Sequence, residues 1–442
     1  MRQEKYDVVV VGSGLGGMTA AALLAVSGYR TLVLEKLPFI GGRHANHKYN
    51  GFILPTGAMW LSEETHGRLC REVGVPFELR LPNPRYNYRI VNKDNKDHIV
   101  PESGGIAEMV ATACGNNLEV QRLMVAIRRG ISWAEPSRRI SLYEWLLHYV
   151  PHNENVLGVF GIFTTMAMSA SVFDLPAAEF FRSLKEMTTE RTYGTASGGA
   201  GSVIDSLAGI IIGKGGEVWT RASVKQIVVK NGLANGVKVE TAHGEMQISA
   251  QAVLSNVDPR ETVNLTGKEN FDRGYLTDVD SLPEATPGII IYVESTRPLM
   301  EHQGGLWVIE GRRNLRLYQL SNLCPEWAPR GKHLLEAIWT VLTPAPYYDM
   351  GKEIQTGIEL MKRSLPDFDR YGKILTVECF HKGWPISRCR GGYSLPIKTP
   401  VENLFNVGDA IEPAASRMTS GAIMSGRLVV EEVKKRYSPG MV

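Results

Sequence analysis

The sequence predicts a fold of two parts: an α/β part built on a parallel sheet, and an α+β part, of antiparallel sheet and helices, inserted into it. Three observations support this prediction. Residues 6–11, YDVVVV, form the β-branched apolar run that is typical of a buried parallel strand. Alternating strand patterns fill much of residues 288–342, as expected for an antiparallel sheet. Residues 404–407 form a strand pattern followed by a helical one, which returns the chain to the α/β part.

The composition excludes several classes of function. A chain of 442 residues suggests two or three domains, and a net charge of +3 gives no reason to expect a nucleic-acid partner. The five cysteines are odd in number and include no CxxC pair, so we expect no disulfide framework, no metal site and a cytoplasmic location. The strand pattern that begins at Tyr6 leaves no room for a signal peptide.

Two segments raise the question of a membrane. Residues 155–173 carry no charge and approach the length of a membrane span, but they contain several Ser, Thr and Gly residues. We expect them to line a buried apolar cavity, with a shallow membrane-dipping surface as the alternative. Five arginines between Arg122 and Arg139, against one acid, fit a solvated helix face or a peripheral contact with anionic lipid.

The first forty residues predict a Rossmann-like dinucleotide site. Gly12, Gly14 and Gly17 have the GxGxxG spacing between a strand and an alanine-rich helix. These glycines permit the tight turn, the approach of a pyrophosphate to the backbone, and close helix packing. A second strand ends at Glu35, where a carboxylate can bind an adenosine ribose. The pattern does not by itself distinguish FAD from NAD. The expected contacts are Gly12, Ser13, Gly14, Leu15, Gly16, Gly17, Glu35 and Lys36.

The segment that follows, GGRHANHKYNGFILPTGAMWL, resembles the phytoene desaturase and amine oxidase superfamily of flavoproteins. In that superfamily a Gly-Gly-Arg and an apolar Asp-Thr-Gly segment follow the ribose-binding acid; here Pro55 stands at the Asp position. The resemblance implies a glutathione-reductase-like fold and non-covalent FAD, and it implies FAD contacts from Gly42, Arg43, Gly57, Ala58, Met59 and Trp60.

The C-terminal segment carries the same resemblance. After its strand come Gly408 and Asp409, and then a helix that we expect to start near Met418. Asp409 can bind a ribityl hydroxyl, and the helix can direct its positive end at the flavin N1–C2=O edge. We expect Trp60 and Met418 to face the flavin, while the catalytic residues stay undetermined. The implied FAD contacts here are Gly408, Asp409, Met418, Thr419 and Ala422.

The middle of the chain predicts a meander and a discontinuous FAD domain. Alternating residues from Gly215, with turns at Asn235-Gly236 and His243-Gly244, suggest three antiparallel strands. The resemblance implies that Val224 contacts the adenine. The expected division is an FAD-binding domain at residues 1–80, 191–270 and 386–442 and a substrate domain at residues 81–190 and 271–385.

The sequence most resembles the phytoene desaturase, carotenoid isomerase and retinol saturase branch, through GGYSLPIKTPVENLFNVGDA and SNVDP. This implies an FAD-dependent oxidoreductase that desaturates, saturates or isomerises carbon–carbon bonds of an apolar, isoprenoid or polyene-like substrate. The rival function is an amine or amino-acid oxidase, with Trp384 and Tyr393 as aromatic candidates. A prenyl-binding carrier without redox chemistry is a third reading. The electron partner and the oligomeric state stay open.

Several other residues near these motifs could suggest a metal site or a covalent flavin bond, but we expect them to have other roles. His44 and His47 could suggest a metal pair or a histidyl–flavin bond, but we expect hydrogen-bonding loop residues. A cluster just before the C-terminal motif has no metal-ligand spacing and is expected to border the substrate pocket. It comprises Cys379, His381, Trp384 and Cys389.

Overall fold

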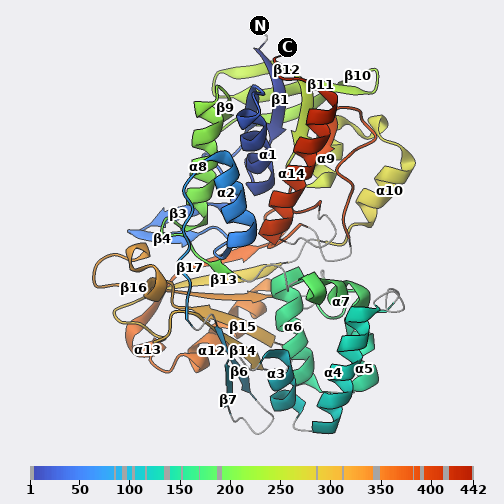
Figure 1. Cartoon of the computed structure of the whole chain (residues 1–442). Helices are drawn as coiled ribbons and strands as arrows, with labels where there is room; N and C mark the ends of the chain where they lie inside the picture. Colours follow the sequence, from blue (N-terminus) through green and yellow to red (C-terminus); the bar gives the residue numbers. More distant parts are fainter. Residues whose placement is uncertain are drawn as a thin grey trace.

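The computed structural model places two sheets one above the other, with both chain termini at the far end of the upper one (Figure 1). It describes residues 4–83, 86–91, 97–101, 105–114, 117–133, 140–150, 153–168, 170–186, 192–284, 287–310, 313–341, 349–381, 383–388, 393–411 and 418–440.

The upper sheet has seven strands in the described part of the chain, in the order β10-β11-β12-β1-β2-β9, with β18 beside β12. The pairs that involve β1, β2, β9 and β18 are parallel. The strands are β1 (Glu4–Val11), β2 (Thr31–Leu34), β9 (Glu217–Trp219), β10 (Ser223–Lys230), β11 (Leu233–Thr241), β12 (Gly244–Ser255) and β18 (Leu404–Asn406).

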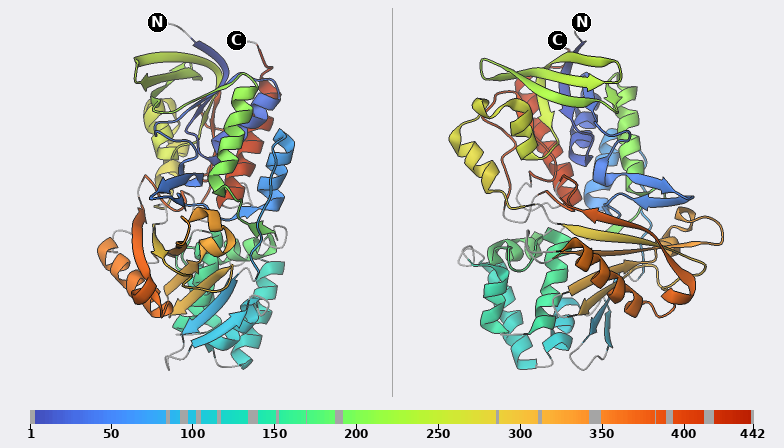
Figure 2. Two further views of the ribbon diagram at one scale, coloured as in Figure 1. Left: turned by 90° about the vertical axis from the view of Figure 1, so that its left-hand side faces the viewer. Right: turned by 180° about the vertical axis from the view of Figure 1, so that it is seen from behind.

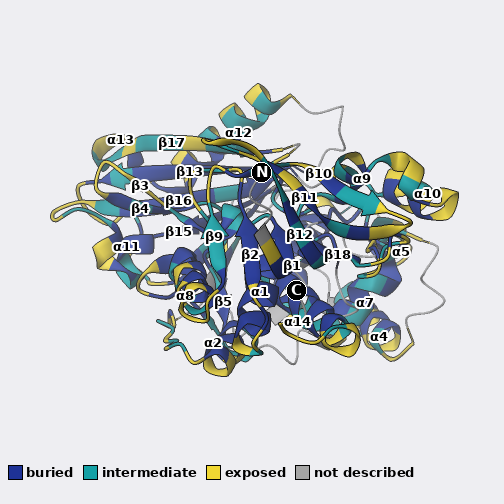
Figure 3. Ribbon diagram, turned by 90° about the horizontal axis from the view of Figure 1, so that it is seen from above, coloured by how far each residue is buried: buried dark blue, intermediate teal, exposed yellow. Residues whose placement is uncertain are grey.

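Helices cover both faces of this sheet. Helix α1 packs against α8 and α14, and its alanine-rich sequence allows this close approach, so that nearly all of α1 is buried (Figure 3). The helices are α1 (Leu15–Val26), α2 (Arg68–Val73), α8 (Gly199–Gly213), α9 (Pro259–Thr266), α10 (Arg273–Ser281) and α14 (Met418–Arg436).

The predicted meander exists, but one of its turns was wrong. Strands β10 and β11 are joined at Asn231 and Gly232, which both adopt positive φ. Gly236 lies inside β11, at an irregularity in its pairing with β10. An added Cβ there would lie 2.0 Å from the Ile248 carbonyl oxygen, so this glycine serves close strand pairing rather than a turn. The turn at Gly244 is confirmed.

The lower sheet also has seven described strands, in the order β17-β13-β16-β15-β14-β6-β7, all antiparallel except the β14–β6 pair. Its strands are β6 (Tyr86–Val91), β7 (Asp97–Pro101), β13 (Gly288–Ser295), β14 (Gly305–Glu310), β15 (Arg313–Tyr318), β16 (His333–Thr340) and β17 (Gly372–Phe380). The described part of the chain also holds two small antiparallel pairs: β3 (Asn46–Tyr49) with β4 (Phe52–Pro55), and β5 (Leu61–Ser62) with β8 (Tyr193–Gly194).

The two faces of the lower sheet are covered differently. One face, with residues such as Ile289 and Leu317, packs on α12 in an apolar core. The opposite face contributes Ile290 and Tyr292 to a second core, which it shares with the helical region. These helices lie beside the lower sheet (Figure 2). The helices are α3 (Gly105–Cys114), α4 (Asn117–Ser132), α5 (Leu142–Tyr149), α6 (Glu154–Met168), α7 (Ala177–Glu186), α11 (Leu320–Leu323), α12 (Met350–Ser364) and α13 (Phe368–Tyr371).

The uncharged segment of residues 155–173 forms most of α6, which contacts β14 and β15. Its apolar side chains, including Phe160 and Ile162, are buried in the protein. Among the helices that the structure describes, none is long and apolar enough to cross a bilayer.

Candidate functional site

A cavity of about 1480 Å³ lies between the two sheets. The upper part of the molecule contributes the glycine loop after β1, the end of β2 and the start of α14. The lower sheet contributes one wall, with Ile290, Arg316, Ile338 and Phe380. Because ligand sites for one small molecule usually measure about 300–1,000 Å³, this cavity has room for a large cofactor together with a second ligand.

The glycine loop is shaped by close contacts that exclude side chains. Gly12 has a φ of 94°, which L-residues with a Cβ rarely adopt. A Cβ at Gly14 would lie 2.6 Å from the end of the Asn256 side-chain amide, and one at Gly16 would lie 2.7 Å from the Cα of Gly408. Gly14 also caps α1 without a side-chain hydrogen bond. The backbone N–H groups of this helix start are therefore available to a pyrophosphate.

Glu35 lies at the end of β2 and lines the same cavity. One carboxylate oxygen accepts hydrogen bonds from the Ser13 backbone N–H at 2.9 Å and from the Ser13 hydroxyl at 2.7 Å. The other oxygen accepts from the Leu37 N–H at 2.9 Å. These bonds fix the carboxylate at the cavity wall, where its remaining lone pairs can accept the hydroxyl groups of a ribose.

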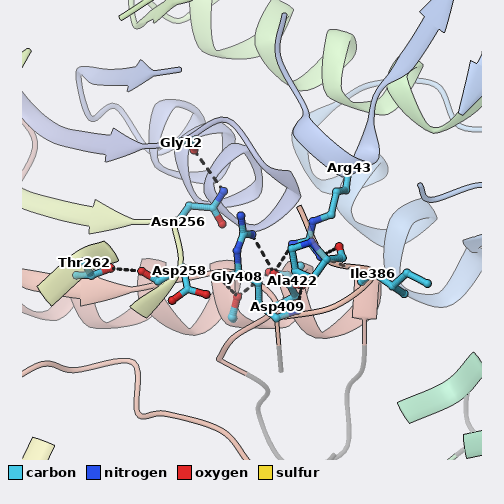
Figure 4. Close-up of polar contacts among 12 residues, drawn as sticks. Gly12, Arg43, Asn256, Asp258, Thr262, Ile386, Gly408, Asp409 and Ala422 are labelled. Atoms are coloured by element: carbon cyan, nitrogen blue, oxygen red, sulfur yellow. Dashed lines mark hydrogen bonds and ion pairs between the residues drawn. The ribbon is translucent and has the colours of Figure 1, made fainter. Parts of the chain in front are cut away.

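Asp409 joins Arg43 and Arg388 in a partly buried ion cluster near the glycine loop (Figure 4). Its Oδ1 lies 2.8 Å from the Arg43 guanidinium and 3.4 Å from that of Arg388, and its Oδ2 accepts from the Arg388 backbone N–H at 3.0 Å. Burial alone would raise the pKa of Asp409, but the two arginines offset this and lower the pKa below its ordinary value. The cluster holds two cationic side chains at the cavity wall, which suits the negative charge of a pyrophosphate.

The structure brings most of the predicted cofactor residues to one cavity. From the first segment, Gly12, Gly14, Leu15, Gly16, Glu35, Lys36, Gly42, Arg43, Gly57 and Ala58 line it. From the later segments, Val224, Gly408, Asp409, Met418, Thr419 and Ala422 do so. Ser13 lies behind the wall and bonds to Glu35, and Gly17 packs against the Gly12 carbonyl. Segments that are far apart in the sequence thus meet at one cavity, as the motifs predicted.

Met59 and Trp60 lie elsewhere. They line a separate, much smaller cavity with Tyr318 and Trp327. The Trp60 ring contacts the edge of the Tyr318 ring, with centroids 5.6 Å apart. The chain turns after Ala58, so that Trp60 packs into the lower core instead of lining the large cavity. Of the two flavin-facing candidates, Met418 lines the cavity and Trp60 does not.

Pro55 stands where the superfamily has an aspartate, and its backbone forms a hydrogen bond with the lower sheet. The Pro55 backbone carbonyl accepts a hydrogen bond of 2.6 Å from the hydroxyl of Tyr292 on β13. This bond ties the β3–β4 hairpin to the lower sheet. His44 is buried and stacks on His66, with ring centroids 5.4 Å apart, while His47 is exposed. Burial lowers the pKa of His44 to about 3, so its ring is neutral.

The residues of the lower wall were largely missed from the sequence. His381 and Trp384 line the cavity as expected, whereas Cys379 does not and Cys389 falls outside the described residues. Arg316 was not singled out, because an arginine in an alternating strand reads as a solvent-facing residue. In fact Arg316 is only 6% exposed. Among the described residues, its side chain donates one hydrogen bond, to the Thr340 hydroxyl at 3.3 Å.

Comparison with known proteins identifies the family. The family model for flavin-containing amine oxidoreductases matches residues 15–434. The chain belongs to this family. It is an oxidoreductase with FAD as its cofactor, and the cavity offers the glycine loop, acid and helix start that FAD requires. Its relatives fall in the phytoene desaturase-like branch, so that part of the prediction is confirmed.

Three similar proteins define how far the likeness extends. An uncharacterised protein of Methanocaldococcus jannaschii is 26% identical over 96% of this chain and 98% of its own length. The prolycopene isomerase of Daucus carota is 27% identical over 62% of this chain, which spans 51% of that protein. An oxidoreductase of Methanosarcina mazei shares the mixed α/β structure with a TM-score of 0.85 and 26% identity, over 97% of this chain and all of the other.

Proposed function

We propose that this enzyme acts on carbon–carbon bonds of an apolar, isoprenoid or polyene-like substrate, by desaturation, saturation or isomerisation. The observation that carries the proposal is the lower wall of the cavity. We call the glycine loop, Glu35 and the start of α14 the cofactor cradle. The lower wall, which faces it, is mainly apolar and includes Ile290, Ile338, Phe380 and Ile386. Such a lining binds a hydrocarbon chain by removing its surface from water.

The residues divide this task between them. When bound, FAD accepts or donates a hydride. The glycine loop, Glu35 and the Arg43–Asp409–Arg388 cluster would hold the cofactor, while the apolar wall would position the chain and exclude water. Two relatives in the same branch, named prolycopene isomerase and all-trans-retinol 13,14-reductase, act on substrates of this chemistry. The chain spans only about half the length of each.

The rival function, amine or amino-acid oxidation, would use two aromatic rings around an amine. Trp384 lines the cavity, but Tyr393 does not and is 38% exposed. This separation of the two rings favours the polyene substrate. A prenyl carrier without redox chemistry would have no need for the cofactor cradle, so we do not favour it.

A single-turnover experiment tests the proposal. The FAD-loaded enzyme, oxidised or reduced anaerobically with dithionite, is mixed with a carotene or retinol in neutral detergent, or with a primary amine. We expect the polyene product to form with one of the two enzyme forms, and no bleaching of the flavin by the amine. Flavin bleaching by amines together with inert polyenes would favour the oxidase instead. Inertness toward both classes would favour a carrier.

We also propose a peripheral contact with anionic lipid through α4. Its exposed face carries Leu118 and Val125, which are 67% and 54% exposed, beside Arg122 and Arg129, and Trp133 follows the helix. Arg138 and Arg139, which the sequence adds to this group, lie outside the described residues. Exposed apolar residues among cations suit an anionic membrane surface. Sedimentation with vesicles containing phosphatidylglycerol, and not with neutral ones, would support the contact; equal recovery with both would contradict it.

A further inference from the structure

Arg316 occupies an unusual place in the substrate half of the cavity. It lies on β15, near the centre of the lower sheet, and its register partner on β16 is Ile338. Ile338 in turn pairs with Ile290 on β13. All three side chains line the cavity. The row ends on β17 with Glu378, the register partner of Ile290, which does not line the cavity. Within the part of the row that lines the cavity, Arg316 is therefore a cation beside two isoleucines.

The guanidinium of Arg316 is poorly satisfied by the protein. Its bond to the Thr340 hydroxyl is long, at 3.3 Å, and the Arg316 Nε has no partner among the described residues. No described carboxylate forms an ion pair with it, in contrast to Arg43 and Arg388. A buried charge without a counter-ion is strongly unfavourable. A bound anion at this point would remove most of that cost.

Glu336 is the one acid of the neighbouring strand that could neutralise this charge from within. It lies on β16, where its register partners are Tyr318 on β15 and Tyr292 on β13. Its side chain lies on the same face of the sheet as that of Arg316. Its Oε2 has no partner among the described residues, and it makes no ion pair with Arg316. Burial raises the pKa of Glu336 to about 7, and the lowering effects of Tyr292 and Arg316 only partly offset this. At and below neutral pH much of Glu336 is therefore uncharged.

We propose that Arg316 anchors a carboxylate at one end of the apolar substrate, so that the ligand is an amphipathic isoprenoid acid. A carboxylate matches the planar donor fork of a guanidinium in two parallel hydrogen bonds. Ile338 is the neighbour of Arg316 across the sheet, and Ile290 and Phe380 line the same cavity further along the wall. These three side chains would hold the hydrocarbon chain. The inference rests on the proposed function, because it assigns the polar end of the substrate for that same site.

Binding of inert probes to the FAD-loaded enzyme tests the anchor. Phytanic acid is a saturated isoprenoid acid, and phytanol is the corresponding alcohol. Each is titrated calorimetrically in the same neutral detergent at pH 6.5. We expect the wild type to bind the acid at least about tenfold more tightly than the alcohol, because charge-assisted hydrogen bonds are about twice as strong as neutral ones. Equal affinities would overturn the inference without any variant.

Variants then assign the preference to one residue. Arg316→Gln removes a charge that has no ionic partner to orphan, so the variant is expected to fold and retain FAD. It should bind acid and alcohol equally, and Arg316→Lys should keep part of the preference. Arg363→Gln is the matched control, since Arg363 is exposed on α12 and pairs with Glu310 at the surface. An undiminished preference in Arg316→Gln would overturn the inference.

The failures of the two proposals can be told apart. Polyene turnover by an enzyme that shows no acid preference would refute the anchor and leave the proposed function standing. An acid preference that depends on Arg316, in an enzyme that turns over amines and no polyene, would support the anchor and refute the proposed function. If Arg316→Gln shifted the flavin reduction potential and left the acid preference intact, Arg316 would serve the cofactor, and the anchor would be refuted.

Discussion

Two groups of charged residues lie at the same cavity, and they are built in opposite ways. In the cofactor half, Asp409 has two arginine partners within 3.4 Å and a lowered pKa. In the substrate half, Arg316 has only a hydroxyl partner, and Glu336 on the next strand has a pKa raised to about 7. The first cluster is complete within the protein. The second lacks a counter-ion in the part of the chain that the structure describes.

The difference indicates separate tasks. A completed ion cluster holds its side chains in one arrangement before the ligand arrives, which suits a cofactor that stays bound. An uncompensated cation is costly until a ligand neutralises it, so it favours ligands of one charge over others. The comparison can be tested by removing charges from each cluster in turn.

Removal of the central anion should have the largest effect. Asp409→Asn leaves the partly buried Arg43 and Arg388 without this counter-ion, at an expected cost of up to about 3–5 kcal/mol. We expect a marked fall in melting temperature and in FAD retained through gel filtration. The control is Asp367→Asn, which removes an exposed partner of Arg297 and should cost less than about 1 kcal/mol. Similar losses in both variants would mean that the Arg43–Asp409–Arg388 cluster has no special role.

Because of Glu336, the free energy of unfolding should depend on pH. The pKa of Glu336 lies near 7 in the folded protein, above its ordinary value of 4.5. Folding therefore takes up a proton at Glu336 between these pH values. The stability that this proton uptake provides is complete below pH 4.5 and is lost as the pH rises through 7. The loss amounts to about 3 kcal/mol.

Glu336→Gln should abolish this loss. We expect its melting temperature to exceed that of the wild type at pH 8, and the gap to close at pH 5. Thermal denaturation of both proteins across this range provides the measurement. A gap that is constant with pH would show that Glu336 keeps its ordinary pKa in the folded protein.

The smallest effect concerns the link between the two halves. Tyr292→Phe removes the hydrogen bond to the Pro55 carbonyl and should cost about 1–3 kcal/mol, because the buried carbonyl loses its donor. FAD content should stay complete, since Tyr292 does not line the cavity. The free energy of unfolding and the FAD content are measured on the same samples. Loss of FAD without loss of stability would contradict this role.

The two halves also differ in how well the sequence predicted them. The cradle depends on local signals: the glycines that allow tight turns, and Glu35 at the end of a strand, keep their meaning wherever the chain is placed. The lower wall depends on which face of an antiparallel sheet is covered. Arg316 and Glu336 alternate with apolar neighbours, which is also the pattern of a strand with one solvent-facing side. Only the tertiary fold buries them.

Trp60 illustrates the same limit. Its motif lies correctly beside the cradle, since Gly57 and Ala58 line the cavity. Whether the next large side chain faces the cavity or the core depends on the direction of the chain after Ala58, and this follows from packing against Tyr318, far away in sequence. The motif could therefore predict the neighbourhood of Trp60 but not its orientation.

The central claim is that one cavity holds FAD and an apolar ligand at the same time, each in its own half. It is tested most directly by titrating the FAD-loaded enzyme with phytanic acid, followed by gel filtration and measurement of the flavin in the protein fraction. We predict a saturable change in the flavin absorbance spectrum with FAD fully retained. Release of FAD in proportion to the acid bound would show that the two compete for one site, and would contradict the account.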